Sequence, residues 1–149
     1  MRMKRISILM VLVNLLVITN SSMAAESKFL NNKAETKQLC EAFMQKVIAG
    51  KIEEAINSIE PYFPLPESEL ATIKVQAVKQ FGLVEPRFGK PLGYEFIKEE
   101  IIKETIIKYT FIEKFEKHVV KWTFFFYKPQ EKWLLNAFYF DDTIQTLFE

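Results

Sequence analysis

Few residues in this 149-residue chain have the type and spacing that catalysis or metal binding requires. His118 is the single histidine and Cys40 the single cysteine, and they lie far apart in the sequence. A Ser-His-Asp triad or a zinc site needs several such groups held together. His118 falls at a predicted hairpin turn, where we interpret it as a solvated turn residue. We therefore predict no catalytic residue, no metal site and no cofactor.

The remaining candidates for chemistry also have plainer interpretations. Asp141 and Asp142 could offer oxygen ligands, but two adjacent acids at the end of a strand are typical of a solvated turn. The few glycines fit helix caps or turns, and none belongs to a phosphate-binding loop. Cys40 lies on an apolar helix face, so we expect a buried side chain instead of a reactive thiol.

The densest aromatic stretch is VVKWTFFFYKPQEKWLLNAFYF, residues 119–140. Aromatic and β-branched residues favour strands, and Pro129 belongs in a turn because it has no N–H to donate. The pattern predicts strands at 119–127 and 133–140, joined by the polar turn 128–132. A preceding strand is expected at 105–115. Residues 94–103 fit a further strand, bulged or regular, although their spacing also suits a helix.

Side-chain alternation along these strands predicts which residues share a face. Pairing Phe111 with Trp122 and Trp122 with Phe138 gathers an apolar face, whose members are Ile107, Tyr109, Phe111, Trp122, Phe124, Phe126, Leu134, Phe138 and Phe140. The same alternation puts Asn136 on this face, opposite Phe124. A slip of one residue would exchange the two faces, so the register is a hypothesis.

Asn136 is the most informative polar residue of this face. A buried amide left without a partner would cost about 1–3 kcal/mol. It could bond to a helix end or to Tyr109, or it could be the polar contact of an apolar ligand pocket. On the second interpretation we predict a site for a small apolar ligand, formed by Tyr109, Trp122, Phe124, Asn136 and Phe138.

The opposite face of the sheet is mixed, and it includes Phe125, Tyr127, Trp133 and Tyr139. Soluble monomers rarely expose a large apolar patch, so another surface should cover these residues. The cover could be the C-terminal segment, residues 141–148, which we expect to form a turn or short helix. It could also be a second copy of the chain, which makes these four residues the predicted interface of a homodimer.

The N-terminus has the pattern of a cleaved signal peptide, with a basic start, an apolar run at 6–18 and small residues at Ser22 and Ala24. The run is shorter than the roughly 20 residues that a membrane span needs. We predict a signal peptide at 1–24, a single domain at 25–149 and a periplasmic or secreted protein without a membrane span. Cleavage would leave 17 basic and 19 acidic residues. Without a basic stripe, nucleic acid is not an expected partner.

Three helices are predicted before the sheet. Asn32 to Glu35 has the form of a capping box, and the apolar stripe that follows ends at Gly50. A second helix at 52–59 is ended by Pro61, and a third runs from Pro66 to Gly82. Residues 26–31 are expected to be a mobile leader, and 89–93 a loop. Helices followed by antiparallel strands define an α+β domain: three N-terminal helices packed on a curved antiparallel sheet of about four strands.

This order resembles the NTF2-like superfamily, which has the cystatin-like α+β fold and includes small exported bacterial proteins of unassigned function. The resemblance covers Ala34 to Phe148 and is carried mainly by VVKWTFFFYKPQEKWLLNAFYFDD, with Trp133 after the turn and Asp141-Asp142 at the exit. It implies a cone formed by the sheet around the helices, and dimers that pack through their sheets.

The resemblance also implies what an enzyme of this type would need, namely an acid or a histidine beside a tyrosine inside the cone. Tyr109 is available, but no acid is predicted beside it, and Glu113 shares its face only near a turn. The leading hypothesis is a non-catalytic binding module, with a small apolar pocket or a dimerising sheet face. The alternatives are an isomerase or hydrolase that uses Tyr109 with an acid from a loop, and a structural protein of the envelope.

Overall fold

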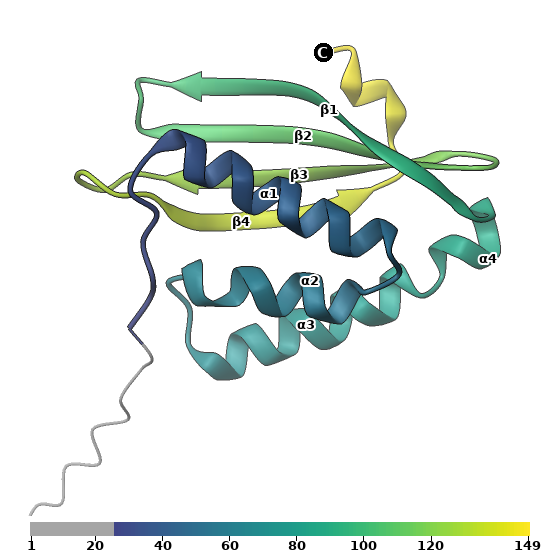
Figure 1. The fold of residues 1–149 in the computed structure, drawn as a ribbon, viewed down its shortest axis with the longest axis horizontal. Helices are drawn as coiled ribbons and strands as arrows, with labels where there is room; N and C mark the ends of the chain where they lie inside the picture. The colour runs from purple at the N-terminus through teal and green to yellow at the C-terminus, as the bar shows by residue number, and fades with distance from the viewer. Residues whose placement is uncertain (1–25) are drawn as a thin grey trace, which may run out of the picture.

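A computed structural model describes residues 26–149, so the predicted signal peptide lies outside the described residues. Four helices precede four strands, and short 3-10 helices follow α2 and the last strand (Figure 1). Their bounds are α1 Lys33–Ile48, α2 Ile52–Ile59, η1 Glu60–Tyr62, α3 Glu67–Phe81, α4 Val84–Phe88, β1 Pro91–Ile102, β2 Ile106–Phe115, β3 Val119–Tyr127, β4 Leu134–Asp141 and η2 Ile144–Leu147.

The strands form one antiparallel sheet in the order β1-β2-β3-β4, and α1 lies across one of its faces (Figure 1). We call the face that packs against the helices the inner face, and the opposite one the outer face. Helices gathered on one face of an antiparallel sheet make an α+β domain. The order of helices followed by one four-stranded antiparallel sheet confirms the predicted α+β fold class.

The start of α1 has the predicted cap. The Glu35 amide donates to Asn32 Oδ1 at 2.9 Å, and the Glu35 carboxylate accepts from the Asn31 amide at 2.7 Å. These bonds satisfy amides that have no partner within the helix. They also lower the pKa of Glu35, with the bond from the Asn31 amide as the main cause.

The register between β2 and β3 is the one predicted from side-chain alternation. Phe111 lies opposite Trp122, Tyr109 opposite Phe124, and Ile107 opposite Phe126. The short connection at 116–118 leaves little freedom for another register. In β1 the register shifts between Phe96 and Lys98, so this segment is the bulged strand and not the alternative helix.

The register between β3 and β4 differs from the prediction. Phe124 pairs with Phe138 and Phe126 with Leu135, so Asn136 is an extra residue that the pairing skips. This is a β-bulge, which lets both Leu135 and Phe138 face inward although they are three residues apart. The prediction that Asn136 faces the inner side was therefore wrong, and its side chain is exposed. Leu134, predicted inside, pairs instead with Tyr127.

Trp133 also departs from its predicted place. It forms an isolated bridge with Leu30, with backbone bonds of 2.8 and 2.9 Å, and both side chains are buried. Residues 26–31 are thus a bonded strap and not a free leader, since the Lys28 amide also donates to Pro61 O at 2.7 Å. Covering the Trp133 ring removes more apolar surface from water than leaving it on the outer face.

Candidate functional site

The middle of the inner face is filled by its own side chains. Phe43 of α1 lies at the centre, with its ring 5.2 Å from the rings of both Trp122 and Phe124 in edge-on contacts. A water-sized probe reaches none of the central strand residues, which are 0% exposed: Ile107, Tyr109, Phe111, Trp122, Phe124 and Phe126. Packing of this kind leaves no room for a ligand unless side chains move.

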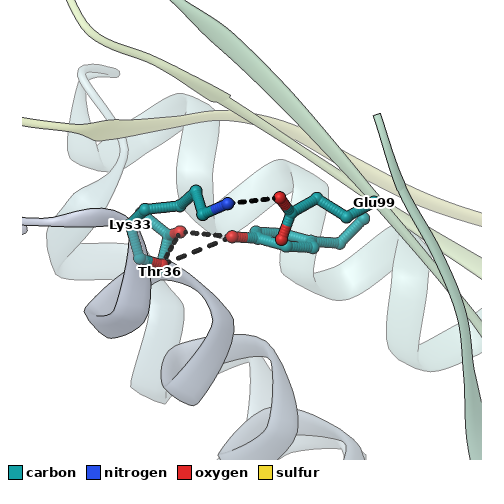
Figure 2. A network of polar contacts seen from close by, with 4 residues as sticks. Lys33, Thr36 and Glu99 are labelled. Carbon is teal, nitrogen blue, oxygen red and sulfur yellow. Dashed lines mark hydrogen bonds and ion pairs between the residues drawn. The ribbon is translucent and has the colours of Figure 1, made fainter. Parts of the chain in front are cut away.

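Tyr109 holds the first turn of α1 against the sheet by bonding to Thr36 and Lys33, which Figure 2 labels together with Glu99. Its hydroxyl lies 2.9 Å from Thr36 Oγ1 and donates to Lys33 O at 3.3 Å, and the Lys33 ammonium pairs with Glu99 of β1. Burial raises the pKa of Tyr109 to about 12. The hydroxyl that the sequence offered for ligand binding or catalysis is therefore used in packing.

Glu113 is the one carboxylate among the fully buried large side chains of the described residues. It lies on the inner face of β2, it is 1% exposed, and Trp122 Nε1 donates to its Oε2 at 3.2 Å. Burial raises the pKa of Glu113 to about 7, partly offset by the Trp122 bond. Side-chain alternation predicted Glu113 on this face. Its position near a turn led us to expect no catalytic role for its carboxyl group.

A short helix packs against the end of β2 that follows Glu113. This helix, α4, for which the sequence analysis made no prediction, places Phe88 against Phe115 with ring centroids 6.3 Å apart. The Lys117 amide donates to Phe88 O at 2.9 Å, which ties α4 to the β2–β3 turn. The sequence signal that could have predicted this helix is the pair of apolar residues Val84 and Phe88, which are four positions apart and so lie on one helix face.

A groove opens at this end of the domain, where α1, α2, α3 and α4 begin or end. It has a volume of about 670 Å³, within the range usual for small-molecule sites. We call it the end groove, and its lining is Gly50, Ile52, Val78, Phe81, Gly82, Glu85, Pro86, Gly89, Lys90 and Glu116. Ile52, Val78 and Phe81 give it an apolar wall that is continuous with the core.

The polar edge of the end groove is formed by residues 89–90 and Glu116. Glu116 Oε2 accepts from the Lys90 amide at 3.0 Å, and Gly89 adopts a φ of +87°. A Cβ on residue 89 would lie 2.5 Å from Glu116 Oε2, so glycine is required here both for its backbone angle and for space. Glu85, Lys90 and Glu116 thus offer two carboxylates and one amine beside an apolar wall.

Phe81 and Trp122 link the end groove to the buried carboxylate of Glu113. Phe81 lines the groove, and its ring centroid lies 5.6 Å from that of Trp122 and 5.7 Å from that of Phe140. Trp122 in turn donates to Glu113. A molecule in the groove would therefore touch Phe81, which packs against the ring that donates to Glu113.

The predicted ligand residues do not form one site. Tyr109, Trp122 and Phe124 are together in the filled interior, whereas Asn136 lies in the bulge on the edge strand. Phe138 is only partly buried, and it packs against Phe43 with ring centroids 5.9 Å apart. Whether this interior ever admits a ligand stays a prediction, but Asn136 cannot be its polar contact in this conformation.

The predicted interface residues divide in a similar way. Tyr127 and Tyr139 are 41% and 46% exposed on the outer face, and Phe125 stacks on Tyr139 with ring centroids 6.0 Å apart. Trp133 is 5% exposed, so little of its ring is open to a second copy in this conformation, and its place in an interface stays a prediction. The C-terminal segment covers part of this face, where Lys121 contacts Thr146 of η2. It leaves the end of the face near Ile106 and Tyr127 open.

Other groups in the described part of the chain add no catalytic or metal-binding cluster. Cys40 is buried, and burial raises the pKa of its thiol well above the usual value. Residues 26–149 contain no group of three or more histidine, cysteine or acidic side chains placed to hold a metal ion. None of the helices in this part has the length and apolar character to cross a membrane.

No family model and no curated protein matches the chain. It is similar to a solved structure from Campylobacter jejuni described as "Putative NTF2-like transpeptidase". The two share 19% sequence identity, with a TM-score of 0.49, over 68% of this chain and 97% of the other. A similarity at this level gives no information about what the present chain binds or does.

Proposed function

We propose that this protein is a non-catalytic binding module that takes a small apolar ligand in the end groove. The observation that supports this most strongly is the contrast in access between the interior and the groove. The middle of the cone is closed to water, whereas the groove is open, about 670 Å³ in volume and backed by Phe81. An apolar wall with a few polar groups at its edge is the usual design of a small-ligand site.

The polar edge suggests how a ligand would be oriented. Ile52, Val78 and Phe81 would contact its apolar part, and the carboxylates of Glu85 and Glu116 lie at the rim. A neutral or cationic end would suit these carboxylates better than an anionic one. The ligand class is therefore a small apolar molecule that carries no negative charge.

Gly82 provides a steric test of this site. It lines the groove, and a Cβ built there meets only Lys79 O and Val78 O at ordinary distances of 3.5 Å. Its φ of −58° is helical, so Gly82→Leu should fold normally while its side chain fills the groove. Binding of the neutral dye N-phenyl-1-naphthylamine, followed by its fluorescence, should weaken about tenfold or more in this variant.

Val75→Leu is the matched control, because Val75 lies on α3 but is 66% exposed and does not line the groove. It should bind the dye as the unaltered protein does. Equal dye affinity in Gly82→Leu and Val75→Leu, with both folded by circular dichroism, would reject the end groove as the binding site.

Glu113 favours a second candidate function, an enzyme that uses this carboxyl as a general acid or base. A pKa of about 7 suits proton transfer near neutral pH. This candidate needs Phe81 to swing away so that a substrate in the groove can reach Glu113. The acid would then come from the sheet itself, and not from a loop as the sequence analysis supposed.

Carboxyl labelling separates the two candidates. A water-soluble carbodiimide with a small amine should modify the exposed Glu116 and leave Glu113 untouched if the interior stays closed. Modification of Glu113 on the same timescale as Glu116, located by peptide mass spectrometry, would favour the enzyme and contradict a purely passive groove.

Self-association is proposed for the open part of the outer face. Ile102, Ile106, Tyr127 and Leu134 form one row across all four strands, and the first three are 63%, 37% and 41% exposed. A second copy would remove this row from water. Light scattering should show a dimer at micromolar concentration that Tyr127→Lys converts to monomer. A monomer in the unaltered protein would reject this proposal.

Export is proposed from the sequence pattern of residues 1–24. N-terminal sequencing of the protein recovered from its host should begin at Ala25. Recovery of the intact chain beginning at Met1 from an extracytoplasmic fraction would contradict cleavage there.

A further inference from the structure

The sheet has a free edge at β4, on the side of α2 and α3 (Figure 1). One side of β4 pairs with β3. Among residues 26–149, the other side has a strand contact only just before β4 begins, where Leu30 forms its antiparallel bridge with Trp133. The strap of residues 26–31 then turns away, since the Lys28 amide bonds to Pro61 O. A strand edge with unpaired N–H and C=O groups is a template for pairing with another chain.

The pairing pattern shows which backbone groups of β4 point to this free edge. In an antiparallel sheet, successive residues of a strand direct their N–H and C=O groups to opposite neighbours. The residue after β3 donates to the carbonyl of the residue before β2 at 2.9 Å, so odd-numbered residues of β3 bond toward β4. Thr123 therefore exchanges its backbone bonds with Tyr139. The backbone groups of Phe138 and Phe140, on either side of Tyr139, point to the free edge.

A small hollow lies beside these backbone groups, between β4 and α3. Its volume is about 150 Å³, and residues 138–140 form its β4 wall. The α3 wall is apolar at Ile73 and Ala77, and it carries the amides of Gln76 and Gln80, which lie one helical turn apart. Within the described chain, the side chains that line this hollow are all uncharged. We call it the edge hollow.

A strand that paired with this edge would place alternate side chains in the edge hollow. Phe138 and Phe140 lie opposite Phe124 and Trp122, so their side chains face the inner side of the sheet. Residues that exchange backbone bonds with them would direct their side chains to that same side, toward α3. The volume of the hollow suits small apolar side chains such as valine. The residue between them would face the outer side, next to Tyr139.

We infer that the free edge of β4 binds an extended, uncharged segment of another protein, which pairs antiparallel with residues 137–141. Its backbone bonds to Phe138 and Phe140, and its small apolar side chains enter the edge hollow. The antiparallel direction is the one in which Leu30 already pairs at the start of this edge. In strand addition of this kind, main-chain bonds provide affinity and pockets for alternate side chains provide specificity. The surface is separate from the end groove, which other residues of α3 line.

The probe is a short peptide of alternating threonine and valine, Thr-Val-Thr-Val-Thr, capped at both ends so that it carries no charge. Added to the isotope-labelled full chain, it should shift the amide NMR signals of residues 137–141 with a dissociation constant of about 1 mM or below. The amide protons of Phe138 and Phe140 should also exchange more slowly with water, because the peptide bonds to them. Signals that stay fixed up to about 10 mM peptide would overturn the proposal.

N-methylated peptides separate strand pairing from simple apolar contact. The two valines lie opposite Phe138 and Phe140 in the proposed pairing, so their N–H groups donate to β4, whereas that of the central threonine points away. Methylating both valine nitrogens should weaken binding at least tenfold. Methylating the central threonine nitrogen should leave the affinity unchanged. Equal losses from the two modifications would mean that no strand pairs here.

Gln76→Trp tests the position of the peptide, because a large side chain at this exposed position of α3 fills the edge hollow. It should weaken peptide binding about tenfold. Val75→Trp is the matched control, since Val75 is the next residue of the same helix, is 66% exposed and does not line the hollow. Equal affinity in the two variants, with both folded by circular dichroism, contradicts the proposal.

The remaining competitor for this edge is a second copy of the chain. Without peptide, the amide signals of residues 137–141 should not depend on protein concentration. If they shift as the protein is diluted, a second copy occupies the edge and the proposed peptide partner is rejected.

Discussion

The inner face of the sheet and the end groove use the same kind of side chain with opposite results. Phe43, Trp122 and Phe124 meet edge to face, and no water-sized probe reaches the two strand residues. Phe81 belongs to the same aromatic cluster, but one side of it is open to the groove. The difference arises where helices end: α1 covers the middle of the sheet, whereas the end groove lies where α3 gives way to α4. We infer that the many aromatic side chains of this chain serve to pack the interior. On the proposed function, a ligand binds where this aromatic cluster ends, in the end groove.

The largest expected effect comes from opening the filled region. Phe124→Ala should lower the free energy of unfolding by about 3–5 kcal/mol, because it removes a fully buried ring and leaves a cavity. Urea unfolding monitored by circular dichroism measures this loss. Phe81→Ala is the comparison, and it should cost less because one side of that ring already faces the groove. Equal losses for the two variants would contradict the distinction between the regions.

Glu113 should make the interior sensitive to pH. Its pKa rises from 4.5 to about 7 on folding, so the folded state favours the protonated form. The stability that this group supports is fully present below pH 4.5 and is lost as the pH rises through 7. The loss is about 3 kcal/mol between pH 4 and pH 8. Chemical denaturation across this range should show it, and Glu113→Gln should not.

A matched variant isolates this pH dependence from other carboxyl groups. Glu53→Gln lies on the exposed side of α2 and should keep the pH dependence of the unaltered protein. If Glu113→Gln and the unaltered protein lose stability in parallel from pH 4 to pH 8, the carboxyl is not held in a closed interior.

A smaller effect is expected where the interior meets the first turn of α1. Tyr109→Phe removes a hydroxyl bonded to Thr36 and Lys33 O, and should lower the free energy of unfolding by about 1 kcal/mol. Thermal unfolding provides the measurement. Tyr94→Phe is the control, since the Tyr94 hydroxyl has no bond to another described residue in this structure, and it should change stability little. A larger loss in Tyr94→Phe than in Tyr109→Phe would contradict this role.

The smallest effect is predicted for the residue that the sequence made most prominent. Asn136→Ala should change the free energy of unfolding by less than about 0.5 kcal/mol, because the amide is exposed in a bulge. Chemical denaturation would check it. A loss of about 2 kcal/mol or more would place Asn136 in the interior, as the regular register required.

These residues show which features a single sequence can predict. The pairing of Phe111 with Trp122 was predictable because a short turn and strict alternation leave few registers. The bulge at Asn136 could not be predicted. With or without one skipped residue in β4, each face of the sheet has an acceptable mixture of apolar and polar side chains, so the sequence does not distinguish the two registers. The bulge is favoured by tertiary packing, which buries Leu135 and sets Trp133 against Leu30. The first three helices and their ends followed from local signals at Asn32, Pro61 and Gly82.

The candidate sites were less predictable than the fold. The end groove is made of segments from residue 50 to residue 116, and no local pattern reveals that their margins meet. Glu113 was assigned to the correct face, but its burial and its bond to Trp122 depend on tertiary packing that local sequence patterns do not reveal.

The most direct test is a crystal structure of the protein with N-phenyl-1-naphthylamine bound. A closed interior with a binding groove predicts the naphthyl ring against Val78 and Phe81, with Trp122 and Phe124 in their present positions. Electron density for the dye between Tyr109, Phe124 and Phe138 would contradict it, because the cone would then be the ligand site and its packing would be adaptable.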